Sequence, residues 1–122
     1  MTASVKRWFI SEADMANLSP RKARDLIVDC FFEAQRETFA RAKEKAGSSD
    51  TAPESIRTMV AAGVRTAFKE AGDDYDDPTV ESLERAVAVL ARRAAAWGTP
   101  TDIIEHHGAQ IAALLARLRL GT

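Results

Sequence analysis

Apolar residues recur at three- and four-residue spacings along most of the chain, which is the spacing of one face of an α-helix. In the stretch 78–97 such positions are Val80, Leu83, Val87, Leu90, Ala94 and Trp97. One face of 100–120 collects Ile103, Ile104, His107, Ile111, Leu114, Leu115 and Leu118, and one face of 53–71 collects Ile56, Met59, Val60, Gly63, Val64 and Ala67. No alternating strand pattern occurs after the first ten residues. The pattern therefore predicts an all-α protein.

Prolines and glycines divide the chain into four helices. The expected starts combine a proline with a side chain that can cap the first turn, at Ser19-Pro20, Thr51 to Glu54, Asp77-Pro78 and Thr99 to Asp102. The second and fourth of these have the form of capping boxes. The expected ends are glycines that can adopt a left-handed conformation, at Gly47, Gly72, Gly98 and Gly121. The predicted helices cover about 20–46, 53–71, 78–97 and 100–120.

The connections between these helices are short, which favours antiparallel neighbours. We therefore predict a single domain over 1–122 with an up-down-up-down four-helix bundle, although the brief link at Gly98 would also allow the last two helices to meet at a corner. Gly63 is expected to let a neighbouring helix approach closely. Residues 1–19 form an N-terminal arm, in which Ser11 and Asp14 resemble a capping box and predict a short helix over about 12–17.

The first long helix carries two apolar stripes. Ala23, Leu26, Ile27, Cys30, Phe31 and Ala34 share one face, whereas Val28, Phe32 and Phe39 lie well round the cylinder. One bundle core does not easily cover both, so either the arm or a second subunit is expected to cover the second stripe, and both alternatives stay open. The predicted contact residues are Trp8, Phe9, Val28, Phe32, Phe39 and Val89.

The most suggestive chemistry lies at the start of the last helix. Asp102 and His106 are four residues apart on one flank, and His107 shares the core face, where an imidazole can hold a ligand. Bundle metal sites gather several inward-facing acids and histidines, which this sequence lacks, so we predict no metal and no cofactor. Cys30 lies on an apolar face where burial makes a thiol inert. No catalytic motif occurs, which favours a protein that is not an enzyme.

Charge narrows the classes of partner. The formal net charge is −1, which argues against general nucleic-acid binding even though Lys6, Arg7, Arg21, Lys22 and Arg24 concentrate basic side chains. The acidic stretch 73–77 has Tyr75 and Pro78 where a calcium-binding EF-hand loop needs a ligand and a glycine, so a solvated loop is expected.

No apolar run is long enough to span a membrane, and the single cysteine cannot form an internal disulfide. We therefore expect a small cytoplasmic helical bundle that acts by protein–protein contact, as a homodimer through the first long helix and the arm. The alternative is a bundle that binds a metal or a small ligand through Asp102, His106 and His107.

Overall fold

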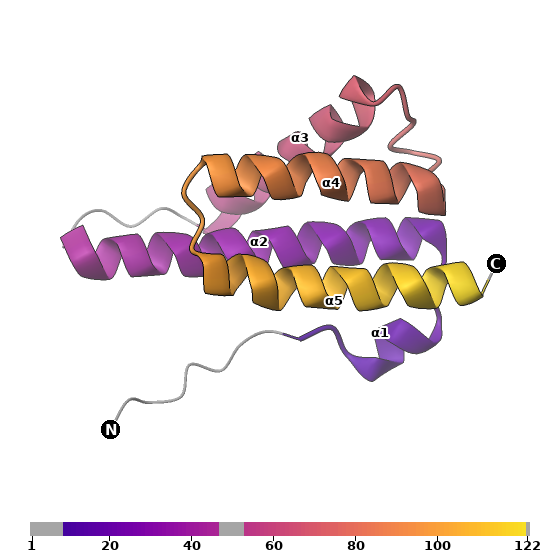
Figure 1. Cartoon of the computed structure of the whole chain (residues 1–122), viewed down its shortest axis with the longest axis horizontal. Coiled ribbons are helices and arrows are strands. Elements are labelled where there is room, and N and C mark those ends of the chain that lie inside the picture. Colours follow the sequence, from indigo (N-terminus) through magenta and orange to yellow (C-terminus); the bar gives the residue numbers. More distant parts are fainter. Residues whose placement is uncertain (1–8, 47–52, 122) are drawn as a thin grey trace.

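The computed structural model describes residues 9–46 and 53–121 (Figure 1). Its helices are α1 (Glu12–Ala16), α2 (Pro20–Ala46), α3 (Pro53–Glu70), α4 (Val80–Ala96) and α5 (Thr101–Leu120). No strand occurs within the described ranges. The all-α prediction is therefore confirmed, and so is the short helix in the arm, where the Ser11 hydroxyl accepts the N–H of Asp14.

The four long helices form an up-down-up-down bundle. α2 and α4 each contact both α3 and α5. Figure 1 shows α2, α4 and α5 running alongside one another, while α3 crosses obliquely behind them, and the chain reverses direction from each helix to the next. Within the described ranges, no helix is apolar over a stretch long enough to cross a membrane.

α4 and α5 begin within two residues of their predicted starts, but the predicted N-cap residues are wrong, and the structure gives a reason for each. α4 begins after Thr79 instead of after Asp77, because the hydroxyls of Thr79 and Ser82 accept each other's backbone N–H. α5 has Pro100 as its N-cap residue and no side-chain cap. Thr99 is buried there and its hydroxyl faces the amide of Gln35, so the predicted capping box at Thr99 does not form.

Glycines end two of the helices as expected. Gly72 and Gly98 have φ values of 76° and 85°, in the left-handed region. Gly121 differs, because its φ of −85° keeps it right-handed. The predicted end at Gly47 and the predicted start at Thr51 lie outside the described residues.

The bundle core covers Val28 and Phe32 of the second apolar stripe of α2, so our expectation that the arm or a second subunit covers that stripe is wrong for these two residues, while Phe39 stays exposed. Val28 and Phe32 are only 9% and 8% exposed, within the same core as Leu26 and Ile27. The oblique α3 covers this side of α2, and the Arg57 guanidinium lies 4.2 Å from the centre of the Phe32 ring. A helix that crosses at an angle reaches a second stripe that a parallel neighbour would leave exposed.

Candidate functional site

The predicted contact residues do not form one surface. Trp8 lies outside the described residues, Val28 and Phe32 are buried, and Val89 is half-buried against the core. Phe9 is 67% exposed and its ring meets the His106 ring of α5, with centroids 4.9 Å apart. The described part of the arm therefore lies along α5 and not on the second stripe of α2. Phe39 keeps part of its ring exposed near the end of α2.

The predicted ligand residues of α5 lie in a polar cluster that joins α5 to α2. Asp102 binds the Arg41 guanidinium through both carboxylate oxygens, at 2.8 and 2.5 Å. Arg41 also donates to Glu37 at 3.0 Å, and the other carboxylate oxygen of Glu37 lies 4.0 Å from Nε2 of the buried His107. The hydrogen bonds to Asp102 raise the pKa of Arg41 above its ordinary value, so this guanidinium stays charged.

The carboxylate of Asp102, a predicted ligand residue, thus makes a structural contact with Arg41 that joins α5 to α2. The sequence analysis missed Glu37 and Arg41, although their four-residue spacing on α2 is a signal for an ion pair on one helix face. Among the described residues, no group of three or more His, Cys, Asp and Glu side chains is arranged to hold a metal ion. Cys30 is fully buried, and burial raises the pKa of its thiol to about 12, so the thiolate is disfavoured.

His106 takes part in a second arrangement, which holds the arm. The backbone N–H of Ile10 donates to Oε1 of Gln110 at 2.7 Å, and Nε2 of Gln110 lies 3.4 Å from Nε2 of His106. The rings of His106 and His107 also meet edge to face, with centroids 4.8 Å apart. The two histidines thus connect the arm to the polar cluster, and Gln110 is a further residue that the sequence analysis missed.

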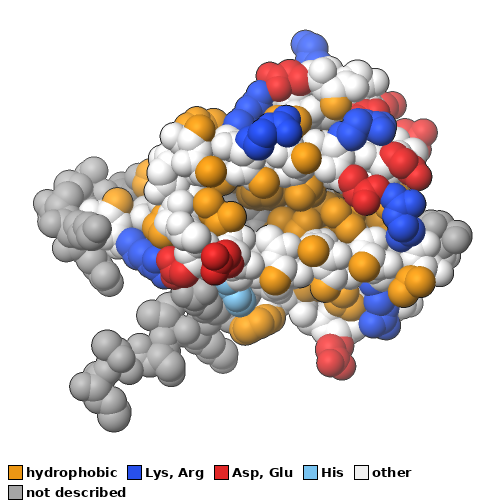
Figure 2. Space-filling model, in the orientation of Figure 1, with side chains coloured by type: hydrophobic (Ala, Val, Ile, Leu, Met, Phe, Trp, Pro, Cys, Tyr) orange, Lys and Arg blue, Asp and Glu red, His pale blue; other side chains and the backbone are white. Residues whose placement is uncertain are grey.

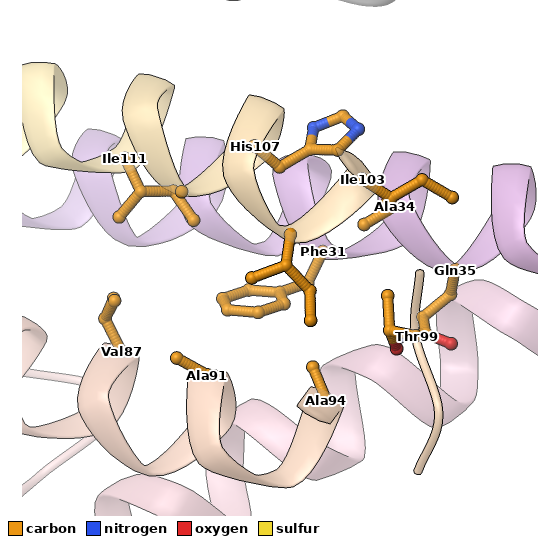
Figure 3. A pocket seen from close by; sticks show the side chains of 12 residues that line it. Phe31, Ala34, Gln35, Val87, Ala91, Ala94, Thr99, Ile103, His107 and Ile111 are labelled. Atoms are coloured by element: carbon orange, nitrogen blue, oxygen red, sulfur yellow. The ribbon is translucent and has the colours of Figure 1, made fainter. Parts of the chain in front are cut away.

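An apolar hollow opens between α4 and α5 (Figure 3). Val87, Ala91 and Ala94 of α4 face Ile103 and Ile111 of α5 across it, and the Phe31 ring of α2 forms its floor. Figure 3 shows the His107 ring pointing away from Phe31, while Gln35 and Thr99 supply the polar atoms at one end. Figure 2 shows hydrophobic side chains gathered between these two helices on the same face of the molecule. The hollow encloses about 50 Å³.

A second apolar hollow, of about 40 Å³, lies between α3 and α4. We call its lining the Trp97 surface: Phe31, Gln35, Met59, Val60, Gly63, Leu90, Ala94 and Trp97. Trp97 is 68% exposed, so its predicted place in the buried seam of α4 is wrong, and Met59 is also exposed. A Cβ built on Gly63 meets no atom within 4 Å. Gly63 therefore lines open space, and its predicted close contact with a neighbouring helix does not occur among the described residues.

The predicted acidic loop and basic cluster meet within the chain. Arg24 donates to the carbonyl of Tyr75 at 2.8 Å, and Arg21 donates to the carbonyl of Asp76 at 3.3 Å. Asp73 binds Arg85 through both carboxylate oxygens, at 2.8 and 2.7 Å. Arg21 and Arg24 thus fix the loop between α3 and α4 to the start of α2, and Arg85 fixes it to α4.

The fold defines the class of this protein, an antiparallel four-helix bundle with a short helical arm. Comparison with models of protein families, with curated proteins and with solved structures finds no match to the chain. Among the described residues, the Trp97 surface carries the largest exposed aromatic side chain.

Proposed function

We propose that this protein acts by protein–protein contact, as a homodimer that associates through the Trp97 surface. The observation that carries the proposal is the position of Trp97, which stands 68% exposed beside an open apolar hollow whose lining also includes Met59, 49% exposed. Tryptophan is enriched among the residues that dominate binding energy at protein interfaces, where such residues fill pockets of the partner.

The size of the hollows favours a side chain over a small molecule as the occupant. Sites for small ligands usually enclose about 300–1,000 Å³, whereas the hollows on the two sides of α4 enclose about 50 and 40 Å³. Such a space takes one inserted side chain. Because Phe31 and Ala94 line both hollows, a partner that packs over this part of α4 would cover both.

Two features favour a second copy of the chain as that partner. First, the protruding Trp97 and the hollow beside it lie on one surface, and a two-fold dimer needs a surface that complements itself. Second, two arginines of the helices that line this hollow are paired within the chain, Arg57 with Asp29 and Arg93 with Glu70. At these two positions, a second copy would not meet an uncompensated like charge.

The test is sedimentation velocity over a series of protein concentrations, comparing wild type with Trp97→Glu. We expect a concentration-dependent dimer in wild type and a dissociation constant at least about 30-fold higher in the variant, since an interface hot spot contributes about 2 kcal/mol or more. Leu120→Glu is the matched control, because Leu120 is 86% exposed but lies at the opposite end of the bundle. This control should dimerise like wild type.

Two results would contradict the proposal. One is a wild-type protein that stays monomeric at every concentration. The other is an equal loss of dimer in Trp97→Glu and Leu120→Glu, which would show that any exposed charge disturbs association. Circular dichroism spectra of both variants should match wild type, because neither side chain is part of the core.

A further inference from the structure

Nothing in the described part of the chain requires a glycine at position 63. Gly63 lies in the interior of α3, where glycine is less favourable than alanine because it loses more freedom on folding. Its backbone is helical, whereas the described glycines with positive φ are Gly72 and Gly98. A Cβ built on Gly63 meets no atom within 4 Å, so no neighbouring group needs the space either. This space is open to a group from outside the chain.

The same hollow carries an aromatic ring that its own chain leaves uncovered. Trp97, the C-cap residue of α4, is 68% exposed and lines the hollow together with Gly63. Met59 lies one turn before Gly63 on α3 and is also exposed. An aromatic ring can pack directly on the backbone at a glycine, because no Cβ keeps it away. One surface thus presents both an uncovered ring and an open position that can receive one.

We propose that the Trp97 ring of each copy packs against Gly63 of the other copy, so that the size of residue 63 determines whether two chains can dimerise. This inference rests on the homodimer proposed above. In a two-fold dimer, a contact from Trp97 to Gly63 of the partner is repeated from the partner's Trp97 to Gly63. A single surface therefore supplies both rings and both of the positions that receive them.

The rest of the lining suits an indole. Phe31, Val60 and Leu90 are apolar, and the thioether of Met59 makes favourable contacts with aromatic rings. The indole N–H needs a hydrogen-bond acceptor when it is buried. Gln35 is the lining residue whose side chain carries a carbonyl oxygen, and its Nε2 donates to the Thr99 hydroxyl at 3.5 Å. The lining thus offers apolar contact together with an acceptor for the N–H.

The first test compares Gly63→Leu with wild type by sedimentation velocity. The leucine fills the hollow from within its own chain, so we expect the dissociation constant of the dimer to rise at least about tenfold. The melting temperature of the monomer should not fall, since leucine favours a helix more than glycine does. Ala62→Leu is the matched control, because Ala62 is exposed on α3 but does not line the hollow. This control should dimerise like wild type.

The second test asks whether the ring and the glycine belong to different copies. Trp97→Ala lacks the ring but keeps the open hollow, and Gly63→Leu keeps the ring but has a filled hollow. Each variant alone loses both contacts of its dimer, whereas a mixed dimer regains one of the two. Native mass spectrometry of an equimolar mixture, in which the variants differ in mass, should therefore show more mixed dimer than the half that random pairing gives.

These tests separate failure of this contact from failure of the proposed dimer. If wild type dimerises and Trp97→Glu dissociates, but Gly63→Leu dimerises like wild type or Ala62→Leu is weakened as much as Gly63→Leu, the contact is wrong and the dimer stands. If the mixture shows only random pairing, Trp97 does not reach Gly63 of the partner, and the contact is again wrong. A wild type that stays monomeric at every concentration overturns both.

Discussion

The two ends of the bundle differ in how completely an aromatic side chain is packed against the rest of the chain. At one end, which we call the Tyr75 end, the loop 71–79 lies over the start of α2, and the guanidinium groups of Arg24 and Arg65 lie 4.6 and 4.7 Å from the centre of the Tyr75 ring. Phe68 packs edge to face on the same ring, with centroids 5.6 Å apart. At the other end, the Trp97 end, the exposed side chains of Trp97 and Met59 line an apolar hollow. Tyr75 thus packs against side chains of its own chain, whereas Trp97 is left 68% exposed.

The cause lies in the sequence of α4. Its last turns place Ala91 and Ala94 beside Phe31 in the lining of the hollows, and these side chains are too small to fill the space. The loop 71–79 instead supplies Tyr75, a large ring with two guanidinium groups close to it. An incompletely packed end of a bundle can therefore serve as a binding surface for a partner. The same kind of substitution made at both ends tests whether the two ends differ in this way.

Truncation of one phenylalanine at each end gives the largest expected difference. Phe68 is 1% exposed, so Phe68→Ala should lower the free energy of unfolding by about 3–5 kcal/mol. Phe31 is half-buried and already faces two hollows, so Phe31→Ala should cost about 1–2 kcal/mol in the monomer. Urea unfolding, at a protein concentration too low for association, measures both losses of unfolding free energy. An equal or larger loss for Phe31→Ala would show that the Trp97 end is as well packed as the Tyr75 end.

Two glycines of α3 and its C-terminal turn should respond in opposite directions to the same substitution. Gly63 lies inside the helix beside open space, so Gly63→Ala should stabilise the monomer by about 0.5–1 kcal/mol. Gly72 has a φ of 76°, so Gly72→Ala should destabilise it by about 1–2 kcal/mol through backbone strain. Thermal unfolding followed by circular dichroism shows whether each substitution raises or lowers the stability. A loss of stability in Gly63→Ala would mean that a side chain already occupies the hollow.

Much of the fold follows from local sequence signals. Spacing and punctuation predict the helix ranges, the arm helix at Ser11 and the glycine turns at Gly72 and Gly98, because these depend on residues a few positions apart. The start of α4 at Thr79 departs from the prediction, since the pair of hydroxyls at Thr79 and Ser82 outcompetes a more obvious Asp-Pro signal.

Contacts between helices are what the sequence predicts poorly. The angle at which α3 crosses α2 decides that Phe32 is buried, and a single helix face carries no information on that angle. The same holds for the candidate sites: Asp102 and His107 draw attention as residues of one helix, but their partners Arg41 and Glu37 are set by the register between α5 and α2. Trp97 continues the seam of α4, yet the bundle ends without covering it.

Acid should weaken the Tyr75 end through Asp73. The hydrogen bonds from Arg85 lower the pKa of this carboxyl in the folded protein, so the unfolded chain binds its proton first as the pH falls. The stability that this ion pair contributes is complete well above about pH 4, the usual value for an unfolded aspartate, and is lost as the pH falls through the lower folded value. The difference in unfolding free energy between wild type and Asp73→Asn should therefore shrink on acidification. Asp76→Asn is the control, because Asp76 contacts Arg21 through its backbone carbonyl. If the difference in unfolding free energy between wild type and Asp73→Asn stays constant with pH, the ion pair of Asp73 with Arg85 does not stabilise the Tyr75 end.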